Sequence, residues 1–270
     1  MKNKKMIVVD LDGTLLNINS GCSSKTKKYL KKLKDLGYII VIATGRILSD
    51  AINITDGAEF VNYIISDSGG LIYDMDNSKI IRKSDILKKD VRRIFNYYND
   101  EIDYITVCDI FNYYRYTVND KIDLFFDKEI KDVDRFIDYN DDILHMIVKF
   151  KSNDLVDKYY NLFNNDDLSI LVMQDSFTDR KWLEIFGKGV SKYNAIKFLM
   201  ELENIDNSDV IAFGDGLNDV DMVSMCGIGV AMGNALDDVK MKANYVTISH
   251  NDDGVIYFLR GYLDKNNLIS

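Results

Sequence analysis

Two aspartates, separated by one residue, follow an apolar run close to the start of the sequence. The run is Met6-Ile7-Val8-Val9, and the aspartates are Asp10 and Asp12. Its length and β-branched content predict a buried strand of a parallel sheet. In an extended strand, side chains two residues apart point to the same side, and packing alone gives no reason to place like charges there. A hard cation or a shared proton would explain the pair, so we expect chemistry here.

Two later apolar runs also end in polar residues. Residues 38–43 are followed by Thr44-Gly45, and residues 210–213 are followed by Gly214-Asp215-Gly216-Leu217-Asn218-Asp219. In open α/β sheets, ligands bind beyond the carboxyl ends of the strands. The aspartates offer only oxygen ligands, which suit Mg²⁺ rather than zinc. The sequence therefore predicts a magnesium site at these strand ends.

A lysine near the start of a later helix supplies positive charge. The helix is predicted over residues 189–203, and the lysine is Lys192. Together with Thr44 and the backbone N–H of Gly45, it would form an anion site. A metal and a phosphate held against a carboxylate describe phosphoryl transfer to an aspartate nucleophile. Lys188 competes with Lys192 for the phosphate role, although a loop charge is the better interpretation of Lys188.

The order of the predicted elements indicates the fold class. Strand, helix, strand, helix and strand alternate through residue 65, which is typical of an α/β protein with a doubly wound, mostly parallel, Rossmann-like sheet. After Gly70 the pattern changes to paired strands with many aromatics, including a strand over 112–118 and a weak helix over 121–137. We predict an α/β catalytic core over 1–82 and 184–270. An inserted α+β cap domain is predicted over 83–183.

Composition limits the kinds of partner. The 270 residues carry a net charge of −9, which disfavours a general surface for nucleic acid or for anionic membranes. No apolar stretch reaches the roughly 18 residues that a spanning helix needs. The three cysteines show no metal-ligand spacing. We expect a cytoplasmic, reduced protein. The predicted anion site makes a small phosphorylated metabolite the expected partner, and we expect a monomer or a homodimer.

Four motifs resemble those of one known family. They are Asp10-Leu11-Asp12-Gly13-Thr14, Ala43-Thr44-Gly45-Arg46, Gly189-Val190-Ser191-Lys192 and Gly214-Asp215-Gly216-Leu217-Asn218-Asp219. Their order and spacing resemble the haloacid dehalogenase-like (HAD) hydrolases. The similarity is closest to the Cof-type phosphatases, whose large C2-type cap is inserted between the second and third motifs. Together the four motifs are highly specific, whereas each one alone is not.

The resemblance implies a role for each matching residue. Asp10 would be the nucleophile and a Mg²⁺ ligand, and Asp12 would be the general acid and base with its backbone carbonyl on the metal. Asp215 would ligate the metal, and Asp219 would ligate it or orient its ligands. The implied phosphate-binding residues are Leu11 and Gly45, through their backbone N–H groups, together with Thr44, Lys192 and Asn218.

The implied function is that of a Mg²⁺-dependent phosphatase acting on small organic phosphate monoesters through an aspartyl phosphate. Sugar phosphates are the favoured substrates, and the cap would close over the site. Two alternatives stay open: a phosphomutase of the same superfamily, and a non-catalytic phosphate-binding protein. Ser68-Gly69 stands where the family usually has Asn-Gly, and Tyr193 stands where Gly is common. Neither departure removes a catalytic group.

Other conspicuous residues have less specific interpretations. Arg46 fits a substrate contact and a surface position at a helix start equally well. His145, in an apolar strand, is better explained as a satisfied buried histidine than as a ligand. The tyrosines of the inserted segment, mostly core or surface, include candidates for the substrate pocket, namely Tyr97, Tyr98, Tyr113, Tyr114 and Tyr116.

Overall fold

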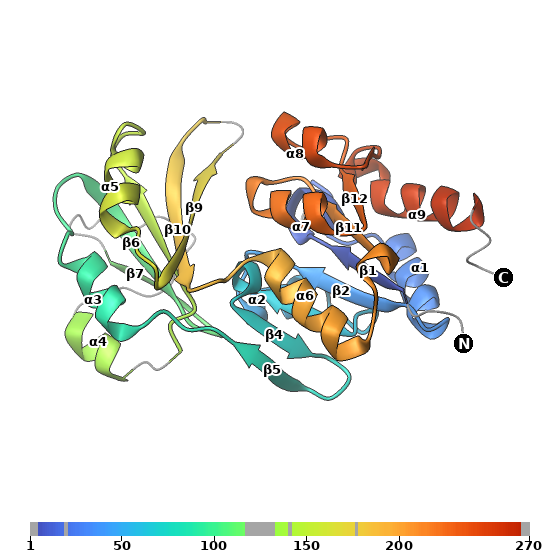
Figure 1. Ribbon diagram of the computed structural model, residues 1–270, viewed down its shortest axis with the longest axis horizontal. Coiled ribbons are helices and arrows are strands. Elements are labelled where there is room, and N and C mark those ends of the chain that lie inside the picture. The colour runs from blue at the N-terminus through green and yellow to red at the C-terminus, as the bar shows by residue number, and fades with distance from the viewer. Residues whose placement is uncertain (1–4, 19–20, 117–132, 140–141, 176–177, 266–270) are drawn as a thin grey trace. The chain divides into compact units, whose positions relative to one another are not determined.

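The chain folds into two compact units (Figure 1). The computed structural model describes residues 5–18, 21–116, 133–139, 142–175 and 178–265. Met1–Ile81 and Ser191–Ser270 form the first unit, here called the core unit, and Arg82–Val190 form the second, the cap unit. The expected boundary after residue 183 falls inside strand β10 (Lys181–Gly187), which pairs along its length with strand β9 (Leu168–Gln174) of the cap unit.

An eight-stranded sheet runs through the core unit in the order β13-β12-β11-β1-β2-β3-β4-β5. Its central strand β1 is parallel to both neighbours, β2 and β11. The pair β3–β4 is antiparallel. The strands are β1 (Met6–Val9), β2 (Ile39–Ala43), β3 (Tyr63–Ser66), β4 (Leu71–Asp74), β5 (Lys79–Lys83), β11 (Val210–Gly214), β12 (Ile228–Ala231) and β13 (Tyr245–Val246).

Helices lie on both faces of this sheet. They are α1 (Ser24–Asp35), α2 (Leu48–Ile54), α6 (Lys192–Glu203), α7 (Val220–Met225), α8 (Asp237–Lys242) and α9 (Gly254–Lys265). From β1 the chain moves one way through the sheet to β3, and from β11 it moves the other way to β13. Right-handed crossovers therefore place α1 and α2 on one face and α7 and α8 on the other. Helix α9 packs on α1, and α6 packs on α7. The predicted doubly wound α/β fold is confirmed.

Local sequence accounts for where the key helices begin. Ser23 caps α1 by accepting a hydrogen bond from the backbone N–H of Thr26, and Ser191 caps α6 by accepting one from Asn194. The four residues of β1 and the five of β2 are all buried, as expected for central parallel strands. The core sheet thus delivers the ends of β1, β2 and β11 to one edge, with the first residue of α6 fixed by its cap.

The cap unit contains a five-stranded antiparallel sheet in the order β7-β6-β8-β10-β9. Its other strands are β6 (Ile102–Cys108), β7 (Tyr113–Tyr116), β8 (His145–Phe150) and β9 (Leu168–Gln174), and its helices are α3 (Lys88–Phe95), α4 (Val133–Tyr139) and α5 (Leu155–Phe163). The apolar core of this unit includes Val107, Val148 and Leu183. Residues 117–118 of the predicted strand and 121–132 of the predicted helix lie outside the described residues.

The conspicuous residues of the cap unit mostly serve its packing. His145 is buried, with its Nε2 3.3 Å from the Sγ of Cys108. Tyr98, Tyr114 and Tyr116 pack against the apolar core. Within the part of the chain that is described, no helix combines the length and apolar character needed to cross a membrane.

Candidate active site

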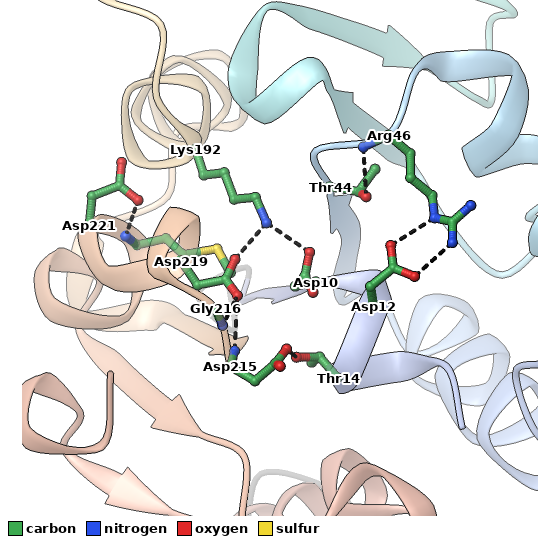
Figure 2. A network of polar contacts seen from close by, with 11 residues as sticks. Asp10, Asp12, Thr14, Thr44, Arg46, Lys192, Asp215, Gly216, Asp219 and Asp221 are labelled. Atoms are coloured by element: carbon green, nitrogen blue, oxygen red, sulfur yellow. Dashed lines mark hydrogen bonds and ion pairs between the residues drawn. The ribbon is translucent and has the colours of Figure 1, made fainter. Parts of the chain in front are cut away.

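Asp10 lies at the carboxyl end of β1 and is buried. Its backbone N–H donates to the carbonyl of Phe213 in β11, which fixes the chain at this point. The Nζ of Lys192 lies 2.7 Å from Asp10 Oδ1 and 2.5 Å from Asp219 Oδ1. Figure 2 shows this ammonium group between the two carboxylates. The first residue of α6 therefore joins the ends of β1 and β11 in one buried charge cluster.

The electrostatics of this cluster are dominated by burial and by like charges. Burial raises the pKa of Asp10 well above its usual value; Asp219 raises it further, and Lys192 opposes both effects. Burial lowers the pKa of Lys192, but Asp10 and Asp219 outweigh burial and raise it above its ordinary value. Burial, followed by the charge of Asp219, raises the pKa of Asp215 to about 6. One ammonium group thus does not balance the three carboxylates.

Hydrogen bonds fix Asp215 and Asp219. Asp219 Oδ2 accepts from the backbone N–H groups of Asp215 and Gly216, each at 2.9 Å. Thr14 Oγ1 donates to Asp215 Oδ1 at 2.8 Å. Gly13, at φ +75°, approaches Asp215 so closely that a Cβ there would lie 2.2 Å from Asp215 Oδ2. Gly13 and Thr14, directly after Asp12, therefore hold the loop that carries Asp215 in place.

The acidic residues fit a hard divalent cation. Asp10, Asp215 and Asp219 each offer a carboxylate oxygen, and these oxygens all lie within 4.8 Å of one another. The set contains only oxygen, as Mg²⁺ prefers. Its excess negative charge raises the pKa of Asp10 and of Asp215, and a bound cation would relieve that repulsion. The predicted magnesium site thus agrees with the donor chemistry of these side chains.

Asp12 does not share the environment of Asp10. Its side chain is exposed and accepts two 2.7 Å hydrogen bonds from Arg46, through Nε and Nη2 (Figure 2). The expectation that both aspartates extend the strand and point to one side is wrong. β1 ends at Val9, and the chain turns through Leu11–Leu15. The Asp12 side chain lies outside the acidic group of Asp10, Asp215 and Asp219. That its backbone carbonyl ligates the metal stays a prediction.

The second strand end carries the predicted anion-binding residues. Thr44 is buried, and its Oγ1 accepts a hydrogen bond of 3.1 Å from the backbone N–H of Arg46, which leaves its hydroxyl proton to donate elsewhere. A Cβ on Gly45 would lie 3.4 Å from Asn218 Nδ2. The structure thus brings Gly45 and Asn218, 173 positions apart, to adjacent positions. Leu11 lies in the turn after Asp10 with its side chain fully buried.

The alternatives left open by the sequence separate clearly. Lys188 is exposed, whereas Lys192 is buried against Asp10. Arg46 is at the surface and pairs with Asp12. Two residues of this region escaped sequence reasoning as site residues. Thr14 belongs to the first motif, so the sequence offered a signal that could have identified it. Asp221 belongs to no motif; it accepts a hydrogen bond from the Tyr193 N–H at the start of α6.

Comparison with known proteins agrees with the motifs. The family model described as haloacid dehalogenase-like hydrolase matches residues 7–259. The chain belongs to this family, and its resemblance to the Cof-type members is confirmed. One curated relative is the 5-amino-6-(5-phospho-D-ribitylamino)uracil phosphatase YcsE of Bacillus subtilis strain 168. It is 29% identical over 260 residues, covering 96% of each chain.

Solved structures show the same fold. BT1666 from Bacteroides thetaiotaomicron, a phosphatase of the superfamily, matches with a TM-score of 0.82 and 24% identity, covering 96% of this chain and 95% of its own. The subclass IIB sugar phosphatase BT4131 matches with a TM-score of 0.80 and 21% identity, covering 96% and 99%. The prediction that the chain is an enzyme of this hydrolase family is confirmed.

Proposed function

We propose that this hydrolase is a magnesium-dependent phosphatase that cleaves small organic phosphate monoesters through an aspartyl-phosphate intermediate. The observation that carries the proposal is the buried Asp10 carboxylate, held by Lys192 beside Asp215 and Asp219. A carboxylate attacks an anionic phosphate only when nearby positive charge screens the repulsion. The names of the curated relatives, which include several phosphatases, support the phosphatase activity.

The metal would be held by Asp10 and Asp215, with the backbone carbonyl of Asp12 as a further ligand. Both oxygens of Asp219 already accept hydrogen bonds, from Lys192 and from the N–H groups of Asp215 and Gly216. Asp219 therefore orients the lysine and the Asp215 loop, whether or not it also contacts the ion. When bound, Mg²⁺ supplies positive charge that screens the substrate phosphate and neutralises the acidic cluster.

The phosphoryl group would be held opposite this cluster. Thr44 has a hydroxyl proton to donate, and Lys192 brings a full positive charge. The backbone N–H groups of Leu11 and Gly45 and the side-chain amide of Asn218 add neutral donors. Such fixed donors stabilise the charge that develops on the equatorial oxygens as phosphorus is transferred, without a cost of reorganisation.

In the first step, an oxygen of Asp10 attacks phosphorus and the bond from phosphorus to the leaving oxygen breaks. Asp12 gives its proton to that oxygen, and an alcohol departs. In the second step, Asp12 takes a proton from water, whose oxygen attacks the phosphorus of the aspartyl phosphate. Inorganic phosphate leaves and the Asp10 carboxylate is restored. Arg46 acts as a positioning residue for the ionised Asp12, the form that takes the proton from water, because its guanidinium donates to both carboxylate oxygens.

The substrate class rests on the relatives and on the family. By its name, the B. subtilis relative YcsE acts on a phosphorylated ribityl compound, and the structural neighbour BT4131 is a sugar phosphatase. Both substrates carry a phosphate on a polyhydroxylated carbon chain. We therefore propose small sugar or sugar-alcohol phosphates as the first substrates to examine.

A panel of phosphate esters with Mg²⁺, read as released inorganic phosphate, tests the proposal. We expect release from one or more sugar phosphates, and from an aryl phosphate. Asp10→Asn should lower turnover of every substrate by on the order of 10⁴-fold or more while the protein stays folded. Conversion of a sugar phosphate to an isomer without phosphate release would instead identify a phosphomutase. An active Asp10→Asn variant would remove the nucleophile from the proposal.

A further inference from the structure

Ser68 is a buried polar residue that the proposed reaction does not yet use. It lies in the turn between β3 and β4, where the family usually has Asn, and its φ of +51° is in the left-handed region. The residue is 1% exposed. Among the residues that the structure describes, no group forms a hydrogen bond with its Oγ. A buried hydroxyl without a partner is costly, so its presence here calls for an explanation.

The turn that carries Ser68 is tied to the loop that carries Thr44 and Gly45. The backbone N–H of Ser68 donates to the carbonyl of Thr44 at 2.9 Å, and that of Asp67 donates to the carbonyl of Arg46 at 2.9 Å. These two bonds bracket Gly45. The position of Ser68 relative to the second strand end is therefore fixed by backbone contacts.

The same turn also contacts the start of α6. Gly69, at φ +110°, lies so close to Ser191 that a Cβ there would be 2.3 Å from the Ser191 carbonyl oxygen. Ser191 is the cap residue that immediately precedes Lys192. The turn is thus wedged between the two segments that carry Thr44 and Lys192, and Ser68 lies within it.

The hydroxyl of Ser68 shares a small space with Asn218. A Cβ on Gly45 would lie 3.4 Å from Ser68 Oγ and also 3.4 Å from Asn218 Nδ2. Because Gly45 has no side chain, both polar atoms border the volume that a Cβ would occupy. That volume is next to the backbone N–H expected to bind phosphate. It is lined by donors of the kind that bind phosphoryl oxygens.

We propose that the Ser68 hydroxyl is a further phosphate-binding group, which donates a hydrogen bond to a phosphoryl oxygen held beside Gly45 and Asn218. The inference rests on the proposed function, because it assumes that Thr44, Gly45 and Lys192 bind a phosphoryl group. It explains why a polar side chain is kept at a buried position where it contributes no bond to the fold. It also gives a function to the Ser that replaces the usual Asn, since both side chains can donate.

Binding of inorganic phosphate in the presence of Mg²⁺, measured by titration calorimetry, tests the inference. Removing a hydrogen bond to a charged group weakens binding about tenfold or more, so Ser68→Ala should raise the Kd for phosphate by that factor. Its thermal stability should equal or slightly exceed that of the wild type, because an unpartnered buried hydroxyl is removed. Ser68→Asn, which supplies an N–H donor and tolerates a positive φ, should recover most of the affinity.

Ser66, in β3 just before the turn, provides the matched control. It is fully buried like Ser68, but its Oγ donates to Asp67 Oδ2 at 2.8 Å. Ser66→Ala should therefore lose thermal stability and keep the phosphate Kd within about twofold. Ser68→Ala should thus weaken phosphate binding without loss of stability, and Ser66→Ala should lower stability without loss of binding. A general disturbance of this region would not separate the two effects in this way.

Two results would overturn the inference in different ways. An unchanged phosphate Kd in Ser68→Ala, with normal binding by the wild type, would remove Ser68 alone and leave the proposed function intact. Absence of phosphate binding by the wild type, together with absence of phosphate release from esters, would remove both.

Discussion

Asp10 and Asp12 are separated by one residue, yet they belong to two different environments. The buried cluster consists of Asp10, Lys192, Asp215 and Asp219, and the exposed pair consists of Asp12 and Arg46. The side chain of Asp10 is 7% exposed, whereas that of Asp12 is 56% exposed. Burial among like charges suits a metal ligand and nucleophile, whereas exposure suits a group that exchanges protons with substrate and water. The two proposed roles therefore differ by environment rather than by residue type.

The backbone creates this difference within a few residues. β1 ends at Val9, and Gly13 takes a positive φ that a residue with a side chain would adopt only with strain and with a clash against Asp215. The turn therefore directs Asp12 toward Arg46 while Asp10 stays at the strand end. Four predictions, ordered from the largest expected effect to the smallest, test the contrast between the buried cluster and the exposed pair.

Replacing the only cation of the buried cluster should have the largest effect. Lys192→Met leaves Asp10 and Asp219 without their shared partner, so we expect a loss of about 3–5 kcal/mol in unfolding free energy at neutral pH. Turnover should fall by about 10²-fold or more, because the positive charge that stabilises the transferring phosphoryl group is removed. Chemical denaturation and phosphate release measure the two effects.

The control is Lys188→Met, which replaces an exposed lysine four residues earlier and should change neither stability nor turnover. A Lys192→Met variant as stable as the wild type would show that Lys192 does not balance the cluster.

Removing the carboxylate of the exposed pair should affect chemistry and leave stability nearly unchanged. Asp12→Asn cannot donate a proton to the leaving oxygen, so turnover of a sugar phosphate should fall by about 10²- to 10⁴-fold. An aryl phosphate should lose less in the first step, because an aryl oxide leaves with less help from a proton. Burst kinetics with both substrates separate formation of the phosphoenzyme from its hydrolysis. Equal losses in its formation would count against Asp12 as the acid.

The buried cluster should make the stability of the metal-free protein depend on pH. Burial, the largest cause, raises the pKa of Asp215 from its ordinary value of 3.8 to about 6. A raised pKa means that the folded state favours the protonated form. The stability that this group contributes is therefore fully present below about pH 4 and is lost as the pH rises through about 6. The loss is on the order of 3 kcal/mol.

Magnesium should oppose this loss, because a metal binds the deprotonated carboxylates. We expect Mg²⁺ to raise the melting temperature clearly near neutral pH and only slightly near pH 5, with a chelator as the reference. Asp215→Asn should remove most of the pH difference between the two conditions. Stabilisation by Mg²⁺ that is equal at both pH values would contradict a metal site formed by these carboxylates.

The smallest effect is expected from the partner of Asp12. Arg46→Gln removes an ion pair whose two side chains are 31% and 56% exposed, so the unfolding free energy should change by less than about 1 kcal/mol. Turnover of a sugar phosphate should fall about tenfold, because Asp12 loses the group that positions it. In the Asp12→Asn background, adding Arg46→Gln should cost no further turnover. Additive losses would indicate that Arg46 acts on the substrate independently of Asp12.

The sequence predicts the fold and the composition of the site better than it predicts the directions of side chains. Apolar runs such as 38–43 are long and β-branched, and the order of strands and helices follows from them. The meeting of Asp10 with Lys192 and Asp219 could be inferred only because parallel strands deliver their ends to one edge and because the motifs resemble a known family. The expectation that side chains alternate in direction failed at Asp12, because it assumes an extended chain and the strand ends three residues earlier, at Val9.

Contacts that depend on tertiary packing carried no signal in the sequence. The pairing of Arg46 with Asp12 needs the turn at Gly13, and nothing in either motif specifies it. Asp221 accepts a hydrogen bond from the backbone N–H of Tyr193 because α6 and α7 pack together. The sequence shows Ser68 as a departure from a family pattern, but only the folded structure shows that it is buried and that its hydroxyl has no partner among the described residues.

The central claim is that Asp10 is the residue that receives the phosphoryl group. Rapid acid quenching of the enzyme during turnover of a good phosphate ester, followed by digestion and mass spectrometry, tests it directly. We predict that the peptide containing Asp10 gains the mass of one phosphoryl group, that the label lies on Asp10 rather than Asp12, and that Asp10→Asn abolishes it. A label on another residue, or rapid turnover with no labelled peptide at any time, would contradict the account.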